Sequence, residues 1–174
     1  MKSASRGIAV LALGLGAVLP GMGLAQSDEA PWPVYVQEEP ARCWIVSDPT
    51  GTTASRGGTD VSGNISRDTA LFFVSYWPDD GRMGEVSYTG GYQFAEDSVV
   101  TVEVGDDSFE LFTEGPMSWA GSPEADARLI AAMREGIEAV VTATSTRGTE
   151  VIDTFSLQGF DRAIDDASVR CAPE

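Results

Sequence analysis

The 174-residue chain contains no histidine, and its only lysine is Lys2. Histidine is the commonest general base and the commonest protein ligand of zinc, so its absence excludes Ser-His-Asp and Cys-His catalysis. Without a lysine beyond position 2, Schiff-base chemistry and Ser-Lys dyads are excluded as well. Most hydrolytic mechanisms are therefore closed to this protein, and we identify no catalytic, cofactor-binding or metal-binding residues.

Carboxylates are the reactive groups that remain, with 27 acidic residues in the chain. A glycosidase needs only two acids about 5 to 10 Å apart, so a carboxylate-dependent enzyme acting on glycans is the alternative functional class. The doublets Asp79-Asp80, Asp106-Asp107 and Asp165-Asp166 fit no calcium-binding motif. Aspartate favours turns because it bonds to nearby backbone amides, so we interpret the doublets as solvated turn residues and expect no metal or other cofactor.

The first 25 residues have the pattern of a secretory signal peptide. Lys2 and Arg6 precede an apolar run at residues 8–19, and Gly23-Leu24-Ala25 fits a small-residue cleavage site. The run is shorter than the roughly 20 residues of a membrane-spanning helix. We therefore expect a periplasmic, secreted or cell-surface protein, with no integral membrane segment after removal of the signal.

Negative charge dominates the chain beyond residue 25. Beyond residue 25, nine arginines stand against 27 acidic residues, a net charge of −18. Such a field repels phosphate backbones and anionic lipid headgroups, and no stretch of the sequence clusters cations. We therefore expect no nucleic acid partner; the partner is an unknown protein or envelope component.

Cysteine is scarce, with only Cys43 and Cys171 in the chain. An exported protein with two thiols normally pairs them, and neither residue belongs to a C-x-x-C redox motif. We predict one structural disulfide between them. The chain-entropy model assigns a loop of this size about 4–5 kcal/mol of stabilisation.

Three prolines among acidic residues predict an extended arm or linker over residues 26–42, without helix or regular strand. Short β-rich runs separated by turn signals follow. A helix is predicted between Ser122 and Gly136, and a second, short helix from Phe160 toward Cys171. Residues 43–172 are thus predicted to form a mainly β domain, an antiparallel β-sandwich or open barrel with one or two short helices. The predicted strands are residues 43–46, 69–77, 85–88, 92–94, 98–104, 108–113, 137–143 and 151–157.

Aromatic side chains could also form a binding site in this protein. Most of them lie at strand spacing and are expected in the core. Trp119 differs because it lies in the loop-like stretch of residues 114–119. It is the candidate for an exposed interaction surface.

Arg147-Gly148-Thr149 and the stretch DTFSLQGFDRA at residues 153–163 resemble the signature that closes the invasion-associated locus B family of alphaproteobacterial exported proteins. Residues 43–46 and 109–112 are similar to further family positions, so the resemblance covers most of residues 40–172. It implies a β-rich periplasmic or surface protein, named for host-cell entry in pathogenic members and without an established catalytic activity. Members often carry a further cysteine pair in the middle of the chain, which this sequence lacks.

The signal peptide, the resemblance and the missing catalytic residue types lead to one functional hypothesis. The protein is an exported, non-enzymatic binding or envelope-associated module rather than an enzyme. Two acids that face each other across an aromatic-lined cleft would instead favour the glycan-acting enzyme.

Overall fold

The computed structural model describes residues 31–172, so the predicted signal peptide lies outside the described residues. Within them the chain forms eleven β-strands, two α-helices and two short 3-10 turns. These elements are β1 (Val34–Gln37), β2 (Arg42–Ser47), β3 (Gly51–Arg56), β4 (Thr59–Asp60), η1 (Ser62–Asn64), β5 (Leu71–Trp77), η2 (Pro78–Asp80), β6 (Arg82–Thr89), β7 (Val99–Val104), β8 (Asp107–Glu114), β9 (Met117–Trp119), α1 (Pro123–Glu135), β10 (Glu138–Thr144), β11 (Thr149–Ser156) and α2 (Phe160–Arg170).

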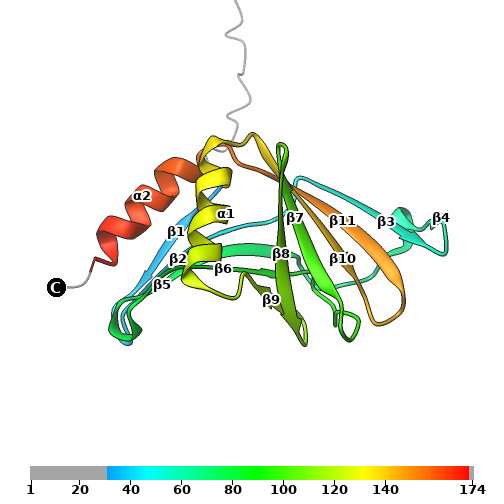
Figure 1. The fold of residues 1–174 in the computed structure, drawn as a ribbon, viewed down its shortest axis with the longest axis horizontal. Helices are drawn as coiled ribbons and strands as arrows, with labels where there is room; N and C mark the ends of the chain where they lie inside the picture. The colour runs from blue at the N-terminus through cyan, green and yellow to red at the C-terminus, as the bar shows by residue number, and fades with distance from the viewer. Residues whose placement is uncertain (1–30, 173–174) are drawn as a thin grey trace, which may run out of the picture.

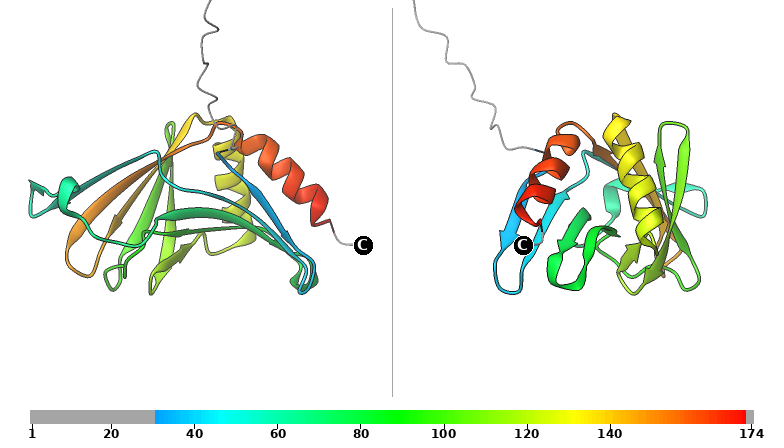
Figure 2. Two further views of the ribbon diagram at one scale, coloured as in Figure 1. Left: turned by 180° about the vertical axis from the view of Figure 1, so that it is seen from behind. Right: turned by 60° about the vertical axis from the view of Figure 1, so that its left-hand side comes forward.

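The strands belong to one open antiparallel sheet, in the order β1-β2-β5-β6-β9-β8-β7-β10-β11-β3-β4. The sheet is strongly bent, with β1, β2, β5 and β6 on one arm and β7, β8, β10 and β11 on the other (Figure 1, Figure 2). Inside the bend the two arms meet, because the rings of Phe72 in β5 and Phe155 in β11 lie 5.4 Å apart between centroids. The predicted mainly β, antiparallel fold is confirmed, as one open curled sheet rather than two packed sheets.

Alternation along the strands decides which side chains fill the space inside the bend. In β5 every second residue is buried, and β2 follows the same pattern. Ile45, Phe72 and Val74 are fully buried in this way. Burying each such side chain contributes roughly 1.5–3 kcal/mol, so the inner face of the sheet is the hydrophobic core.

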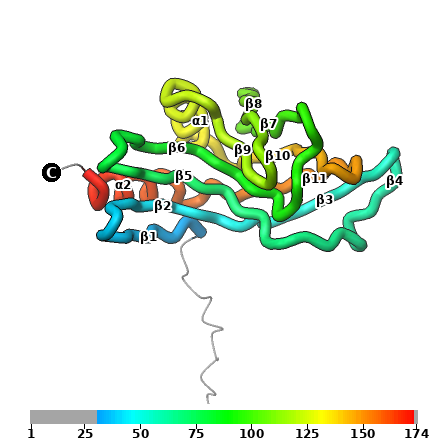
Figure 3. The backbone as a smooth tube through the Cα atoms, turned by 90° about the horizontal axis from the view of Figure 1, so that it is seen from below, coloured from blue at the N-terminus to red at the C-terminus, as the bar shows by residue number. Residues whose placement is uncertain are grey.

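The helix predicted after Ser122 is confirmed as α1. The Ser122 hydroxyl accepts a hydrogen bond from the Ala125 N–H at 3.2 Å, with Pro123 at the first helical position. Leu129 and Met133 are buried from its apolar face. The helix packs against β6, and Figure 3 shows it beside that strand.

The short C-terminal helix is confirmed as α2, which packs on β1 and β2. It follows β11 through Gly159, whose φ of 83° lies in the left-handed region. Phe155, Leu157 and Phe160 are buried around this junction. Cys171 then forms the predicted disulfide with Cys43 in β2, with 5.9 Å between their Cα atoms.

The segment expected to be an extended arm differs from the prediction in one part. Val34–Gln37 is strand β1, which pairs with β2 from Val34 opposite Ile45 to Gln37 opposite Arg42. The prolines flank this run instead of interrupting it, and an edge strand tolerates neighbouring prolines. Trp32 is buried, and its indole N–H donates to the Ser156 carbonyl at 2.8 Å.

Two further local predictions were wrong. Residues 92–94 do not form a strand beside β6; Phe94 makes only an isolated bridge to Ser145, and β6 pairs with β9 instead. The backbone of this segment makes its hydrogen bonds elsewhere: the Gly91 carbonyl accepts from the Asp68 N–H at 3.1 Å, and the Phe94 N–H donates to the Gly115 carbonyl at 3.2 Å. Residues 51–56, which are not among the predicted strands, also form a strand, because β3 pairs over its whole length with residues 149–154 of β11.

Candidate functional site

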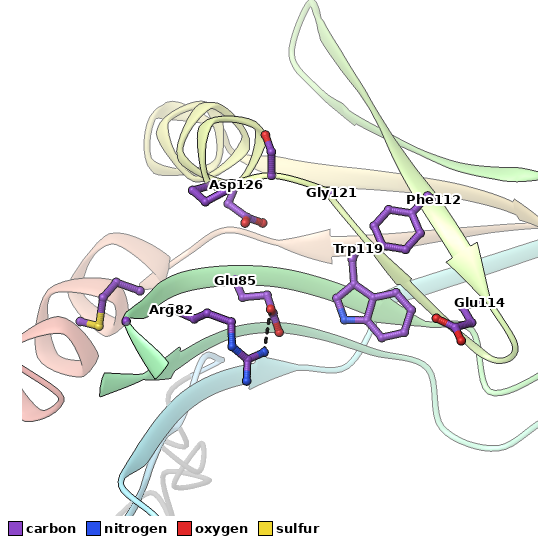
Figure 4. Close-up of a pocket in the computed structure, with 11 residues that line it drawn as sticks. Arg82, Glu85, Phe112, Glu114, Trp119, Gly121 and Asp126 are labelled. Atoms are coloured by element: carbon purple, nitrogen blue, oxygen red, sulfur yellow. Dashed lines mark hydrogen bonds and ion pairs between the residues drawn. The ribbon is translucent and has the colours of Figure 1, made fainter. Parts of the chain in front are cut away.

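A groove of about 540 Å³ lies where β6, β8 and β9 meet the N-terminal turn of α1. Figure 4 shows the side chains that line it. We call it the aromatic groove and define it by Met83, Glu85, Phe112, Glu114, Trp119 and Asp126.

Trp119 lies in this groove, in strand β9 and not in a loop as its sequence context suggested. It is directly opposite Phe112 of β8, and the two rings stack with centroids 5.5 Å apart and an interplanar angle of 27°. Trp119 is half-buried, but Phe112 is 50 % exposed and Met83 is 44 % exposed. The groove wall is therefore an accessible aromatic and apolar surface.

Gly121 gives the ring stack room. A Cβ atom at this position would lie 3.3 Å from the Phe112 ring, and its φ of 88° is one that residues with side chains rarely adopt. The chain can therefore turn from β9 toward α1 directly beside the ring of Phe112.

Carboxylates form the opposite side of the groove. The Asp126 carboxylate accepts a hydrogen bond from the Val86 N–H at 2.8 Å, and burial raises the pKa of Asp126. Glu85 is ion-paired with Arg82 at 3.0 Å, and Arg82 also pairs with Asp80 at 2.8 Å. The dashed line in Figure 4 marks the contact between Arg82 and Glu85.

Glu114 and Asp126 have no cationic partner among residues 31–172. Arg82, the only cationic residue that lines the groove within the described part of the chain, is already shared between two carboxylates. The aromatic groove therefore combines ring faces with unpaired negative charge. Both features attract a cation, and the ring faces also accept an apolar group.

Metal ligation has little support in this part of the chain. Within residues 31–172 no three acidic or cysteine side chains converge in a geometry that could hold a metal ion. The doublets Asp79-Asp80 and Asp106-Asp107 lie at turns, as predicted. Asp165-Asp166 instead lies inside α2, where it pairs with Arg134 and Arg170.

A buried charge network, which sequence reasoning missed, lies inside the bend of the sheet. Asp153 of β11 is completely buried and receives two hydrogen bonds of 2.6 Å from the guanidinium of Arg67. Tyr88 of β6 donates to the same carboxylate at 2.7 Å, and Thr52 of β3 donates at 2.5 Å. Burial raises the pKa of the Tyr88 phenol, which keeps this donor protonated.

One sequence signal pointed to this network. Val151, Asp153 and Phe155 alternate along the predicted strand at residues 151–157, so Asp153 shares the inward face with two apolar residues. An acid on the inward face requires a buried partner, because an unpaired buried charge is strongly destabilising. The sequence does not identify Arg67 as that partner, since 86 residues separate them.

A family model described as Invasion associated locus B (IalB) protein matches residues 37–168, which extend from the last residue of β1 into α2. No curated protein and no solved structure matches the chain.

Proposed function

This chain belongs to the invasion associated locus B family, and we propose that it is an exported, non-enzymatic binding module of the periplasm or cell surface. The Cys43–Cys171 disulfide supports an oxidising compartment. No helix of residues 31–172 is long and apolar enough to cross a membrane. We retain the signal peptide at residues 1–25 and the binding domain at residues 43–172, to which strand β1 and the buried Trp32 from the predicted arm at residues 26–42 also belong.

The stacked pair of Phe112 and Trp119 carries the proposal for the binding surface. We propose that the aromatic groove binds an exposed protein segment that presents an arginine or lysine next to an apolar side chain. The ring faces attract a cation, and Glu114 and Asp126 supply charge that no described residue neutralises. The chain's net charge of −16 favours the approach of a cationic partner.

A defined peptide pair tests this proposal. The protein is titrated with a short peptide of alternating arginine and leucine, and with the same peptide carrying uncharged citrulline instead of arginine. We expect the arginine peptide to bind and Trp119→Ala to weaken its binding roughly 30-fold or more, as for a hot-spot tryptophan.

Trp44→Ala is the matched control, because Trp44 is half-buried and stacks on Tyr35 outside the groove. Isothermal titration calorimetry measures all four combinations of peptide and variant. An equal loss of affinity in both tryptophan variants, or equal binding of the two peptides, contradicts the proposal.

One observation favours the alternative of a carboxylate-dependent enzyme acting on glycans. Asp126 lies in an aromatic-lined groove, and its raised pKa is the property that a general acid needs. Glu85, however, is tied to Arg82, and the invasion associated locus B family is not a known enzyme family. Release of reducing sugar from cell-wall glycans, abolished by Asp126→Asn, would favour the enzyme.

A further inference from the structure

A second cavity, of about 360 Å³, opens at the end of the bent sheet away from α2, between β3 and the β10–β11 turn. In Figure 1 these elements lie on the side of the molecule opposite the two helices. We call it the arginine mouth, because three of the nine arginines beyond residue 25 line it together with polar side chains. Its lining includes Arg56, Asn64, Ser66, Arg67, Thr146 and Arg147.

The pairing of β3 with β11 places polar side chains inside the mouth. Arg56 is opposite Thr149, and Thr52 is opposite Asp153. Directly opposite residues in a sheet share one face, so these pairs line the same inner surface, with Arg56 at the outer end. The Arg56 guanidinium donates two hydrogen bonds to the Thr149 hydroxyl oxygen, at 2.8 and 2.6 Å, which hold it at the cavity wall.

Arg67 forms the inner end of the mouth and contributes no free charge. Its two terminal nitrogens donate to Asp153, Thr52 and the Gly90 carbonyl, and Asp153 neutralises it. The positive charge that remains in the mouth is therefore that of Arg56 and Arg147. Neither arginine has an ion-pair partner among residues 31–172.

Among residues 31–172, no acidic side chain lines the cavity. The acids nearest in sequence to the lining residues do not line the cavity. Asp68 follows Arg67, is exposed and makes no ion pair within residues 31–172. Glu150 follows Thr149 in β11 and is exposed on the opposite face of the sheet, and Asp60 binds the Ser62 N–H and hydroxyl. In a chain of net charge −16, a cavity that has two guanidinium groups without an ion pair and no acidic lining residue within the described part of the chain is a local cationic site.

The remaining lining supplies neutral donors. Asn64, Ser66 and Thr146 are exposed, and none of their side chains makes a hydrogen bond within residues 31–172. Burial raises the pKa of Tyr92, another lining residue, to about 12, so its phenol adds no negative charge at neutral pH. The planar guanidinium group of arginine can donate two parallel hydrogen bonds to two oxygens of an oxyanion. Hydroxyl and amide groups can donate to its remaining oxygens.

From this geometry we propose that the arginine mouth binds a phosphate monoester carried on a sugar-sized polar group. A dianionic phosphate has three terminal oxygens and balances the charges of Arg56 and Arg147. A cavity of about 360 Å³ exceeds the space that one phosphate occupies, and Asn64, Ser66 and Thr146 suit the hydroxyl groups of a sugar. The same headgroup chemistry occurs in soluble sugar phosphates and in phosphorylated lipids.

Titration calorimetry with glucose 6-phosphate, inorganic phosphate and glucose tests the site. We expect the sugar phosphate to bind best, inorganic phosphate more weakly and glucose not at all. Arg147→Gln and Arg56→Gln should each weaken binding about 10-fold to 100-fold, the loss of charge-assisted hydrogen bonds. Affinity should also fall as NaCl is raised.

Arg128→Gln is the matched control. Arg128 is an exposed arginine of α1 without an ion pair in residues 31–172, so the substitution makes the same change in charge away from the mouth. Arg147→Gln is the cleaner test variant, because the Arg147 side chain makes no hydrogen bond within the described residues, whereas Arg56 holds Thr149. Thermal melts of each variant verify folding.

Vesicles of phosphatidylcholine with and without phosphatidic acid test whether the phosphate belongs to a soluble sugar phosphate or to a lipid headgroup. Binding to the phosphatidic acid vesicles alone, lost in Arg147→Gln, would assign the site to a lipid headgroup and support its phosphate chemistry. No binding of any phosphate compound, or equal losses in Arg147→Gln and Arg128→Gln, overturns the proposal. Trp119→Ala should leave phosphate binding unchanged, so this site can fail independently of the aromatic groove.

Discussion

Asp153 shows at the scale of one residue how the core accommodates a charge. Four donated hydrogen bonds, from Arg67, Tyr88 and Thr52, satisfy its two oxygens. Removal of one member of a buried ion pair leaves the other charge uncompensated. Asp153 and Arg67 therefore act as a unit that joins β11 to the segment before β5.

We predict that Asp153→Asn lowers the free energy of unfolding by roughly 3–5 kcal/mol, because it leaves the Arg67 charge without its counter-ion. Urea unfolding followed by tryptophan fluorescence measures the loss. The control is Asp106→Asn at the exposed β7–β8 turn, which should change stability by less than about 0.5 kcal/mol. A double variant, Asp153→Leu with Arg67→Met, should recover much of the loss; equal stability of Asp153→Asn and wild type would contradict the prediction.

Asp126 provides a pH-dependent prediction. Burial raises its pKa above the ordinary 3.8, so the native state holds this proton more tightly than the unfolded state. Its contribution to stability is therefore present at pH values below about 4 and is lost as the pH rises through the native pKa. Asp126→Asn keeps an acceptor for the Val86 N–H and removes the ionisation, so the variant should gain in Tm relative to wild type between about pH 4 and pH 7. If the difference in Tm between Asp126→Asn and wild type stays constant or shrinks as the pH rises over this range, the predicted direction of the effect is wrong.

At the scale of elements, the junction between β11 and α2 depends on Gly159. Its φ is 83°, and a Cβ atom there would meet only Pro31 atoms at 3.8 and 3.9 Å, which is ordinary contact. Glycine is therefore favoured at position 159 because of the left-handed backbone conformation. A side chain there would not clash with its neighbours. A left-handed conformation costs a residue with a side chain roughly 1–2 kcal/mol.

We predict that Gly159→Val lowers the free energy of unfolding by at least about 1–2 kcal/mol, because the branched side chain is poorly tolerated in this conformation. Gly159→Asn should cost less, since asparagine visits the left-handed region more readily. Gly63→Ala is the control, because no atom lies within 4 Å of the added methyl group and its φ is not in the left-handed region. Chemical denaturation of the three variants ranks them; an unchanged midpoint for Gly159→Val would refute the role of Gly159.

The two strands that the sequence did not predict, β3 and β9, have a common cause at the element scale. β9 lies in a polar, glycine-containing stretch, but it pairs with both β6 and β8. β3 is mostly polar and exposed, but β11 offers it a free edge. A strand can therefore form where the local sequence favours a loop, if a neighbouring strand supplies the hydrogen bonds.

At the scale of the whole molecule, charge repulsion dominates the electrostatics. A net charge of −16 on the full chain, or −18 beyond residue 25, repels itself in the compact state. The exposed ion pairs of Arg82, Arg134 and Arg170 offset little of this repulsion, because surface pairs are worth about 0–1 kcal/mol.

We predict that the Tm rises as NaCl is added, because salt screens repulsion over roughly 8–10 Å at about 0.1–0.15 M. Calcium at equal ionic strength should add nothing further, since no metal-binding trio of acids converges within residues 31–172. Differential scanning calorimetry in NaCl and CaCl₂ compares the two salts. A calcium effect that persists in high salt would show specific coordination.

The sequence by itself determined the features that depend on neighbouring residues. Ser122, Pro123 and Gly136 set the limits of α1, the apolar and aromatic run at residues 69–77 predicted β5, and alternation at residues 100–104 predicted β7. The glycine-aspartate turn at residues 105–107 predicted the β7–β8 hairpin. The pairing of two cysteines followed from their number and the predicted export. Caps, turns and alternation are short-range effects, which explains why they can be read along the chain.

Only the tertiary structure decided where these elements meet. The order of strands in the curled sheet brings Arg67 to Asp153, 86 residues away, and brings Arg56 and Arg147 into one mouth although the sequence contains no cluster of cations. It also sets Trp119 against Phe112 across a strand pair. These contacts depend on which strands pair and on how far the sheet bends, and those are long-range properties that side-chain packing inside the bend determines.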